Sequence, residues 1–590
     1  MREYGVPAVG AVADDESLTD MVWANAERFA DAVAFRRRVD GTWLDVTTRE
    51  FASQVLAVAK GLIAAGVGPG DRVALVSRTR YEWTLLDFAV WAAGGVTVPV
   101  YETSSAEQLA WVLADSGARA VVVEDDGHRR TVESVVDRLG EVVRIWQIEP
   151  GGAAPALDEL TALGAEVADA DAHRRRRSVG SADLATLVYT SGTTGRPKGV
   201  ELTHANLLAE LRADIAAFPE LLRPGNSMLV FLPLAHVFAR AISLCCVYAR
   251  TTLGHLPDVS TLVADLAGFR PTFVVAVPRV FEKVYNSARA TAAAAGRGRV
   301  FELAEDVAVR YSQALDSGTV PLGLRAQHLA ASRAVYSRLR GVLGGRCVAA
   351  ISGGAPLGER IAHFFRGIGV PVYEGYGLTE TAAAICVNTR SAFRVGTVGR
   401  PVAGATVRIA DDGEVLLGGP MVSAGYWRGA RTGDWFATGD LGSLDADGYL
   451  RITGRKKELI VTAGGKNVAP AGLEDRLRRH PLVSQCLVVG DRRPFIAALV
   501  TLDPEFAGAW AAERGISPDA LPAHPALRAE LRKAVDEANA PVSKAESIRE
   551  FTVLPRDFTE EAGEVTPSLK LRRDTILKTW AETVSAIYER

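Results

Sequence analysis

The chain has 590 residues, of which 48% are hydrophobic and 23% are charged, and its formal net charge is −3. This length exceeds what one hydrophobic core usually serves, so we expect a large body and at least one smaller domain. The composition is that of an ordinary globular protein, and the near-neutral charge argues against nucleic acid as the main ligand.

Apolar, β-branched runs alternate with amphipathic stretches through the first two thirds of the chain. This alternation predicts parallel α/β layers with sites at the carboxyl ends of the strands. A helix is expected over 203–218 with Thr203 as its N-cap. The basic run 174–177 is interpreted as a solvated or partner-facing surface. The expected strands are 72–76, 118–124, 184–188, 228–232, 272–277 and 347–351.

The segment 189–199, YTSGTTGRPKG, carries the strongest functional signal. Glycines let backbone N–H groups surround phosphate oxygens, hydroxyls add donors or reach a magnesium ion, and a lysine supplies positive charge. The order of residue types favours a polyphosphate loop over a mobile surface turn. The P-loop motif is excluded, because Gly192, Gly195 and Lys198 fall at three-residue spacing and Gly199 follows the lysine.

From about residue 394 the pattern changes to short strands with tight turns, at 407–417 and 444–453. The tail contains a pair of strands, 483–489 and 495–502, then charged helices and a strand near 551–554. We therefore predict an α/β fold with a doubly wound N-terminal body and a separate α+β C-terminal domain. The predicted boundaries are 1–455 for the body, about 394–453 for a β-rich subdomain within it, and 456–590 for the C-terminal domain.

The five cysteines are scattered, with no CxxC pair and no metal-ligand spacing. The first residues lack the apolar core of a signal peptide, and the longest nearly uncharged stretch, 88–101, is shorter than the ~20 residues of a spanning helix. We expect a soluble, cytoplasmic protein that can still touch a membrane peripherally.

Four more segments follow in the order that an ATP site needs: 352–356 (SGGAP), 373–380 (YEGYGLTE), 435–440 (WFATGD) and 454–455 (GR). With these motifs the chain resembles the adenylate-forming superfamily of acyl-CoA synthetases, peptide-synthetase adenylation domains and beetle luciferases. Within that superfamily it is most similar to bacterial long-chain fatty-acid–CoA ligases. The closer likeness is carried by 81–83, 101–105, 231–236, 277–283 and 464–470.

The resemblance implies fatty acid, ATP and coenzyme A as substrates and Mg²⁺ as cofactor, with Thr190 and Glu380 holding the metal. Lys570, Glu380 and His236 would be the catalytic residues, with His236 beside the acyl carboxylate. Tyr376 would stack on adenine, and Asp440 would accept hydrogen bonds from the ribose. Taken alone, Tyr376 would be a core aromatic, Asp440 a local cap and Lys570 a solvated lysine. The residues assigned to ATP are Thr190, Ser191, Gly192, Thr193, Thr194, Gly195, Lys198, Gly353, Gly354, Ala355, Pro356, Glu374, Gly375, Tyr376, Gly377, Thr379, Asp440 and Arg455.

The resemblance also implies two reactions at one place. The first makes acyl-AMP and pyrophosphate, and in the second the thiol of coenzyme A attacks the acyl carbonyl and expels AMP. Rotation of a mobile C-terminal domain would exchange Lys570 for a thioester-step loop containing Gly464, Gly465 and Lys466. Lys457 matches the hinge of this rotation.

Two features depart from the family pattern. The stretch 426–435 is shorter than usual, which we expect to trim a surface excursion, and residue 461 is valine where many members have lysine.

An acyl-AMP ligase that loads a carrier protein shares every ATP motif and stays open as an alternative. A luciferase-like oxygenase and a non-catalytic nucleotide-binding protein are more remote alternatives. Acyl chain length and oligomeric state are not encoded in these motifs.

Overall fold

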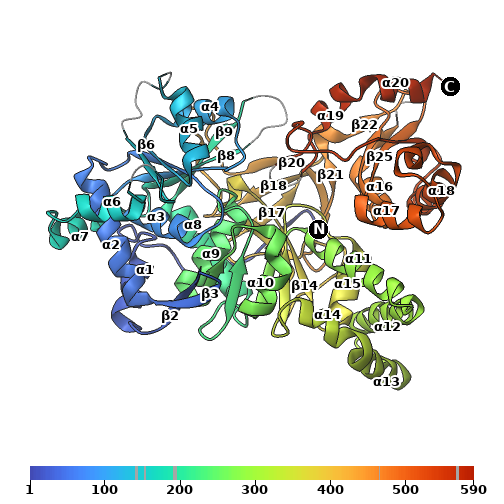
Figure 1. Ribbon diagram of the computed structural model, residues 1–590, viewed down its shortest axis with the longest axis horizontal. Helices are drawn as coiled ribbons and strands as arrows, with labels where there is room; N and C mark the ends of the chain where they lie inside the picture. Colours follow the sequence, from blue (N-terminus) through green and yellow to red (C-terminus); the bar gives the residue numbers. More distant parts are fainter. Residues whose placement is uncertain are drawn as a thin grey trace.

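The computed structural model describes residues 1–137, 139, 144–151, 154–190, 196–463, 466–566 and 570–589. They form a large α/β body and a smaller C-terminal unit beside it (Figure 1). The buried residues of the body's three hydrophobic cores extend no further along the chain than Leu450. The two cores of the smaller unit begin at Ile460. Each part of the molecule therefore buries apolar surface of its own.

The largest sheet has nine strands in the order β16-β15-β14-β13-β12-β10-β11-β2-β3. The strands from β14 to β2 pair in parallel, whereas β15, β16 and β3 are antiparallel to their neighbours. The sheet is thus mixed at both edges and parallel at its centre, where the predicted strands lie. Its strands are β2 (Val33–Val39), β3 (Thr42–Thr47), β10 (Ser227–Val230), β11 (Thr252–His255), β12 (Phe273–Ala276), β13 (Ala349–Ser352), β14 (Val372–Leu378), β15 (Ala383–Val387) and β16 (Arg400–Pro401).

A second sheet has seven strands in the order β19-β9-β8-β5-β4-β6-β7. Here the structure differs from expectation: β8 is followed by the antiparallel strand β9, so 189–199 spans a hairpin and does not lead directly into a helix. The predicted helix begins after β9 as α8 (His204–Ala217), and Thr203 caps it in a capping box with Asn206. The strands are β4 (Arg72–Val76), β5 (Val96–Val100), β6 (Ala118–Val123), β7 (Arg144–Gln147), β8 (Leu184–Thr190), β9 (Lys198–Thr203) and β19 (Gly425–Tyr426).

The third sheet is antiparallel and contains both hairpins expected after residue 394. An additional strand from the very start of the chain pairs with β17, where Glu3 forms an ion pair with Arg408 at 2.6 Å. The N-terminus is therefore part of this sheet. Its strands are β1 (Glu3–Gly5), β17 (Thr406–Ile409), β18 (Glu414–Gly418), β20 (Phe436–Leu444) and β21 (Leu450–Arg455).

The C-terminal unit contains the expected antiparallel pair β24 (Val483–Val489) and β25 (Ile496–Leu502). The last strand, β26 (Ile548–Val553), joins β25 in parallel. A two-stranded ribbon, β22 (Ile460–Val461) and β23 (Asn467–Val468), leads into this sheet. The helices of the unit are α16 (Pro470–Leu477), α17 (Pro504–Ala512), α18 (Pro525–Asn539), α19 (Arg573–Thr579) and α20 (Ala581–Tyr588).

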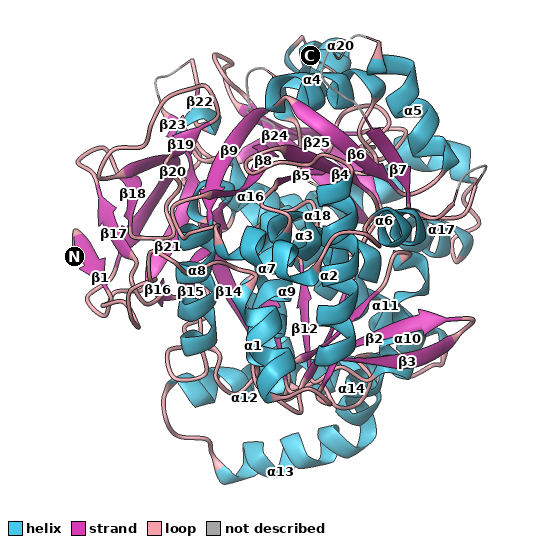
Figure 2. Cartoon of the chain, turned by 90° about the vertical axis from the view of Figure 1, so that its left-hand side faces the viewer, coloured by secondary structure: helices cyan, strands magenta, loops and turns pink. Residues whose placement is uncertain are grey.

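Helices pack between and around the sheets of the body (Figure 2). The helix α3 (Tyr81–Ala92) is buried along its whole length, as its nearly continuous apolar sequence requires. None of the helices within the described ranges is long and apolar enough to cross a membrane. The other body helices are α1 (Asp20–Arg28), α2 (Thr48–Ala64), α4 (Ala106–Ser116), α5 (Asp126–Val136), α6 (Ala156–Leu163), α7 (Asp169–Arg177), α9 (Val237–Ala249), α10 (Leu262–Phe269), α11 (Pro278–Ala294), α12 (Gly298–Asp316), α13 (Leu322–Ala331), α14 (Ser337–Val342) and α15 (Glu359–Gly367).

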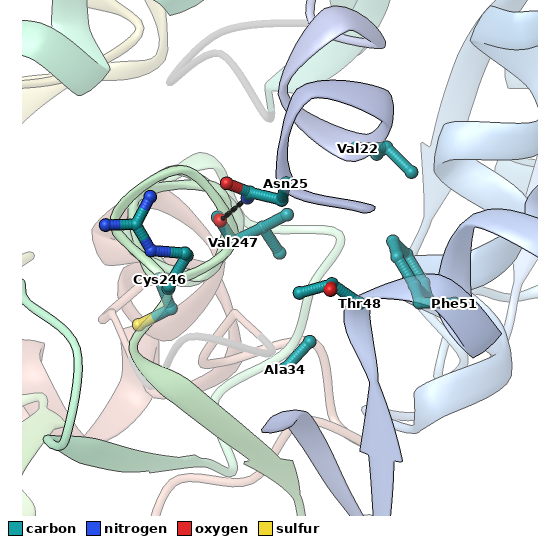
Figure 3. Close-up of a pocket in the computed structure, with 8 residues that line it drawn as sticks. Val22, Asn25, Ala34, Thr48, Phe51, Cys246 and Val247 are labelled. Carbon is teal, nitrogen blue, oxygen red and sulfur yellow. Dashed lines mark hydrogen bonds between the residues drawn. The ribbon is translucent and has the colours of Figure 1, made fainter. Parts of the chain in front are cut away.

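The basic run at the end of α7 does not form the simple solvated surface that the sequence indicated. Arg176 is buried, pairs with Asp20 of α1 at 2.9 Å, and places its guanidinium 4.3 Å from the ring centre of Trp23. On another side of α1, Asn25 donates a hydrogen bond to the carbonyl of Val247 in α9 at 2.8 Å, beside a small pocket (Figure 3). The run therefore helps to fasten the first helix to the body.

Two carboxyl groups lie buried one turn apart on α8. Glu210 accepts a hydrogen bond from the backbone N–H of Ala384 at 2.6 Å, and Cys245 lies 3.8 Å from the Asp214 carboxylate. One oxygen of each carboxyl has no hydrogen-bond partner among the described residues. Burial raises the pKa of Asp214 to about 7, and burial and the Asp214 charge together raise the pKa of Glu210 well above its usual range.

This buried pair makes stability depend on pH. Between the pKa of an unfolded aspartate, about 4, and the folded value, the native state holds a proton that the unfolded chain releases, so the unfolding free energy falls as pH rises. Asp214→Asn removes this titration. The decrease in unfolding free energy between pH 5 and pH 8 should therefore be smaller in the variant by roughly 2 kcal/mol. Urea denaturation at both pH values measures the difference. Asp31→Asn, at a largely exposed aspartate, is the matched control, and an unchanged pH dependence in Asp214→Asn would contradict the assignment.

Candidate active site

The SGGAP and YEGYGLTE segments lie side by side at the carboxyl ends of two adjacent parallel strands. Ser352 at the end of β13 pairs in register with Glu374 of β14. A side chain at Gly377 is impossible, because an added Cβ would lie 1.5 Å from the carbonyl oxygen of Ala383. Gly354 has φ +83°, a left-handed conformation that favours glycine. The predicted adenine-binding segments therefore meet at one edge of the nine-stranded sheet.

Glu374 holds these two segments together. Its carboxyl accepts a hydrogen bond from the backbone N–H of Leu357 at 2.9 Å, just after the SGGAP loop. Burial raises the pKa of Glu374 to about 8, although the Leu357 hydrogen bond partly opposes that rise. Glu374 is therefore mostly neutral at pH 7, and its hydrogen bond to Leu357 holds the SGGAP loop against β14.

Asp440 connects three segments that are distant in sequence. The hydroxyl of Tyr376 in β14 donates to one carboxylate oxygen at 2.6 Å, and Nε of Arg455 in β21 donates to the other at 2.8 Å. Asp440 is buried, and its two partners satisfy a charge that would otherwise be costly to bury. Burial, and then the Asp440 charge, raise the pKa of the Tyr376 hydroxyl well above its usual range. Each oxygen keeps a second lone pair for a further donor.

Tyr426 is a site residue that the sequence reasoning missed. Its hydroxyl donates to Glu380 at 2.7 Å, and Nζ of Lys198 lies 5.5 Å from the centre of its ring. Glu380 lies in the short turn η3 (Thr379–Thr381), while Tyr426 pairs with Val200 of β9. The shortened 426–435 stretch is therefore more than a trimmed surface excursion, because its first residue joins the hairpin of β8 and β9 to Glu380. We call this hairpin, 184–203, the phosphate hairpin after its predicted role.

The described ends of the phosphate hairpin are held from one side by α4. Thr190 pairs with Lys198 across the hairpin. The hydroxyl of Tyr189 donates to Asp115 at 2.6 Å, and the indole of Trp111 donates to the carbonyl of Pro197 at 2.9 Å. The predicted phosphate ligands Ser191, Gly192, Thr193, Thr194 and Gly195 lie outside the described residues.

Lys570 lies among the charged residues of the body, although it comes from the C-terminal unit. Loss of water in the crowded cleft lowers the pKa of Lys570 and the Arg455 charge lowers it further, while Asp440 and Glu380 act in the opposite direction. The residue as a whole is exposed to solvent. The structure thus brings Lys570 within electrostatic reach of Glu380, Asp440 and Arg455.

His236 lies near the same cleft. Its Nδ1 accepts a hydrogen bond from the backbone N–H of Phe238 at 3.2 Å and so caps α9. Burial, and then the charge of Lys570, lower the pKa of His236 to about 3. The imidazole is therefore neutral at physiological pH, with Nε2 carrying the proton while Nδ1 accepts.

The residues predicted to form the hinge and the thioester-step loop are described only in part. Lys457 is exposed in the turn η4 (Lys456–Glu458), directly after β21. Lys466 lies 3.3 Å from Glu546 within the C-terminal unit, and Gly464 and Gly465 fall outside the described residues. The exposed Val461 is in β22, beside this loop.

Two arginines of the body have structural contacts that the sequence did not indicate. Arg279 of α11 donates to Ser484 at 3.1 Å and lies 3.7 Å from Asp557, which ties the C-terminal unit to the body. Arg240 is buried, pairs with Asp87 of α3 at 2.6 Å, and donates to Thr186 of β8 at 2.7 Å. Arg240 therefore fixes the first strand of the phosphate hairpin.

Comparison with known proteins agrees with this arrangement. Residues 22–427 match the AMP-binding enzyme family, and residues 457–590 match the AMP-binding enzyme C-terminal domain. The chain is 51% identical over 600 residues to long-chain-fatty-acid–CoA ligase FadD15 of Mycobacterium tuberculosis and of Mycobacterium bovis, with both chains covered fully. The A domain of a carboxylic acid reductase from Segniliparus rugosus aligns with a TM-score of 0.75 at 21% identity, covering 97% of this chain and 94% of that one. An anthranilate CoA ligase, AuaEII, aligns with a TM-score of 0.73 at 20% identity, covering 97% and 98%.

The fold is that of the adenylate-forming enzymes. The chain belongs to the AMP-binding enzyme family.

The role of Glu374 can be tested by stability. Glu374→Ala leaves the buried N–H of Leu357 without its acceptor and should cost about 1–3 kcal/mol of unfolding free energy. Glu374→Gln keeps an acceptor and resembles the protonated acid, so it should cost clearly less at pH 7. Urea denaturation of both variants makes the comparison. Equal losses for the two variants would show that the hydrogen bond to Leu357 is not what Glu374 contributes.

Proposed function

We propose that this protein is an ATP-dependent long-chain fatty-acid–CoA ligase that forms acyl-AMP and then acyl-CoA. The observation that carries the proposal is the convergence of Lys570, Glu380, Asp440 and Arg455 from four separate segments on one cleft. The full-length relationship to ligases named for long-chain fatty acids supports this choice of substrate. A cytoplasmic location agrees with five cysteines that are all buried and free.

The donor groups fit a magnesium ion. A threonine hydroxyl at position 190 and the Glu380 carboxylate are hard oxygen ligands, and only one oxygen of Glu380 is engaged by Tyr426. Thr190 and Glu380 would hold the ion, which supplies charge neutralisation at the phosphates. Lys198, opposite Thr190 on the hairpin, would add a positive charge for the same phosphates.

The nucleoside would lie along the carboxyl ends of β13 and β14. Asp440 has free lone pairs for ribose hydroxyls, and Arg455 beside it balances its charge. The buried hydroxyl of Ser352 has no hydrogen-bond partner among the described residues, which agrees with a bound group at this edge. Tyr376 would present its ring to adenine while its hydroxyl stays on Asp440.

Adenylation requires a carboxylate oxygen to attack the α-phosphorus, so two anions must approach one another. Lys570 would lower this barrier by placing its ammonium between them. Neutral His236 would donate through Nε2 to the acyl carboxylate without adding a competing charge. Transfer to coenzyme A would follow after rotation about Lys457, which would remove Lys570 from the cleft and bring in Gly464, Gly465 and Lys466.

The role of Lys570 predicts a selective defect. Lys570→Ala should lower acid-dependent ATP–pyrophosphate exchange roughly a hundredfold or more, because a preorganised charge at the reacting centre is lost. Conversion of supplied acyl-AMP to thioester should stay close to wild type. Retained exchange would remove Lys570 from this role. Lys578→Ala, at an exposed lysine of α19, is the matched control.

Lys457→Pro should keep pyrophosphate exchange but lose conversion of supplied acyl-AMP to thioester, because a fixed φ blocks the hinge.

The Tyr426–Glu380 hydrogen bond should matter for metal binding. Tyr426→Phe keeps the ring near Lys198 but removes the donor to Glu380, so the carboxylate is less well oriented. We expect the Mg²⁺ concentration for half-maximal pyrophosphate exchange to rise about tenfold. Tyr449→Phe, whose hydroxyl has no hydrogen-bond partner among the described residues, should leave it unchanged. An unaltered Mg²⁺ requirement in Tyr426→Phe would mean that the bond is dispensable.

A further inference from the structure

The helix α13 stands at the lower end of the molecule in both views (Figures 1 and 2). Its solvent side carries two of the most exposed large apolar residues in the described chain, Leu322 at 82% and Leu329 at 55% exposed. They lie seven residues apart, so they share one face of the helix. Arg325 lies between them on the same face and is exposed as well.

The segment of the chain that contains this face is strongly basic. From Ser317 to Gly358 the chain contains five arginines and no acidic residue. Arg325, Arg333 and Arg338 are exposed, and none of them has an ion-pair partner within the described ranges. The neighbouring helix α12 differs, because its exposed Arg310 is neutralised by Asp306 at 2.8 Å. Positive charge is therefore left uncompensated on α13 and on the helical turns that follow it.

The inner side of α13 is firmly attached, so the outer face is preformed. The ring of His328 stacks on Tyr311 with centroids 3.8 Å apart and hydrogen-bonds the carbonyl of Gly367 at 2.7 Å. Tyr336, in the π-helical turn η2 (Ser332–Tyr336), donates to the carbonyl of Ala304 at 2.6 Å. Leu322, Leu329 and the arginines take no part in these contacts, so nothing in the fold explains their placement.

We propose that the face formed by Leu322, Arg325 and Leu329 of α13 and by Arg333 of the following turn η2 docks on an anionic lipid surface. Leucines that enter the interfacial region and arginines that meet lipid phosphates are the two components of an interfacial helix. A second copy of the chain fits less well, because a two-fold contact would bring the same unpaired arginines face to face. The location agrees with the proposed function, since long-chain acids partition into bilayers, but the inference does not depend on it.

Docking on α13 would leave the C-terminal unit clear of the bilayer. The unit lies above α13 in both views (Figures 1 and 2), on the same side of the molecule in Figure 1. Two leucines give little insertion alone, so binding should require anionic lipid, be reversible and weaken with salt.

Co-sedimentation of the full chain with vesicles tests the proposal without ATP, acid or coenzyme A, so failure here leaves the ligase activity standing. Wild type should bind phosphatidylcholine vesicles containing ~30% phosphatidylglycerol at low salt. It should bind much less to vesicles of phosphatidylcholine alone, and much less to the anionic vesicles at high salt. Arg325→Gln with Arg333→Gln should lower the partition coefficient at least about tenfold, since each arginine near an anionic surface contributes about fivefold. Leu322→Ser with Leu329→Ser should lower it as well, by about tenfold.

Matched controls change charge or polarity elsewhere. Arg130→Gln with Arg549→Gln removes the same charge from exposed sites on α5 and β26, and Leu163→Ser with Leu577→Ser makes the same polarity change on α6 and α19. Both controls should bind vesicles almost as well as wild type. Binding of wild type that ignores lipid charge, or α13 variants that bind like the controls, would overturn the proposal. So would a wild-type dimer that the leucine variant converts to monomer, because the face would then be an interface between copies.

Discussion

A buried carboxylate can stay charged only when partners replace its water, and at Asp440 those partners organise the site. Tyr376 brings in β14, and Arg455 brings in the end of β21, two residues before the proposed hinge at Lys457. Lys570 enters the same electrostatic environment from the C-terminal unit. One charge thus links the proposed nucleoside edge, the connection between the two parts of the molecule and the proposed catalytic lysine.

Buried contacts of Glu210 and Arg240 hold the other side of the cleft. Glu210, buried on α8, accepts from Ala384 just after the strained left-handed Ala382, whose φ is +59°. Those residues directly follow the turn that carries Glu380, so a buried acid far from the cleft helps to fix a proposed metal ligand. Arg240 does the same for the first strand of the phosphate hairpin. Buried contacts therefore hold the body side of the site, and among the described residues Arg279 joins the body to Ser484 of the C-terminal unit.

Local sequence patterns predicted the parts of the fold that local physics decides. Buried parallel strands such as β4 and β6 are short apolar runs rich in valine, and Thr203 has the short polar side chain of an N-cap. The misses depend on pairing between segments that the local pattern does not show. β9 is a strand because β8 and β19 lie on either side of it, and Tyr426 reaches Glu380 only through that pairing. Arg176 can be buried because it forms an ion pair with Asp20, 156 residues away. The adenylation motifs were readable because each is short and contiguous, while their convergence on Asp440 required the fold.

The central claim is that Asp440 and Arg455 act as one unit in adenylation, and a double-mutant cycle on acid-dependent pyrophosphate exchange tests it most directly. Asp440→Asn, Arg455→Met and the double variant are compared with wild type under one set of conditions. Groups in direct contact should couple by about 1 kcal/mol or more, so the double variant should lose far less activity than the product of the two single losses. Strictly additive losses in the activation free energy would show that the two residues act separately and would contradict the account.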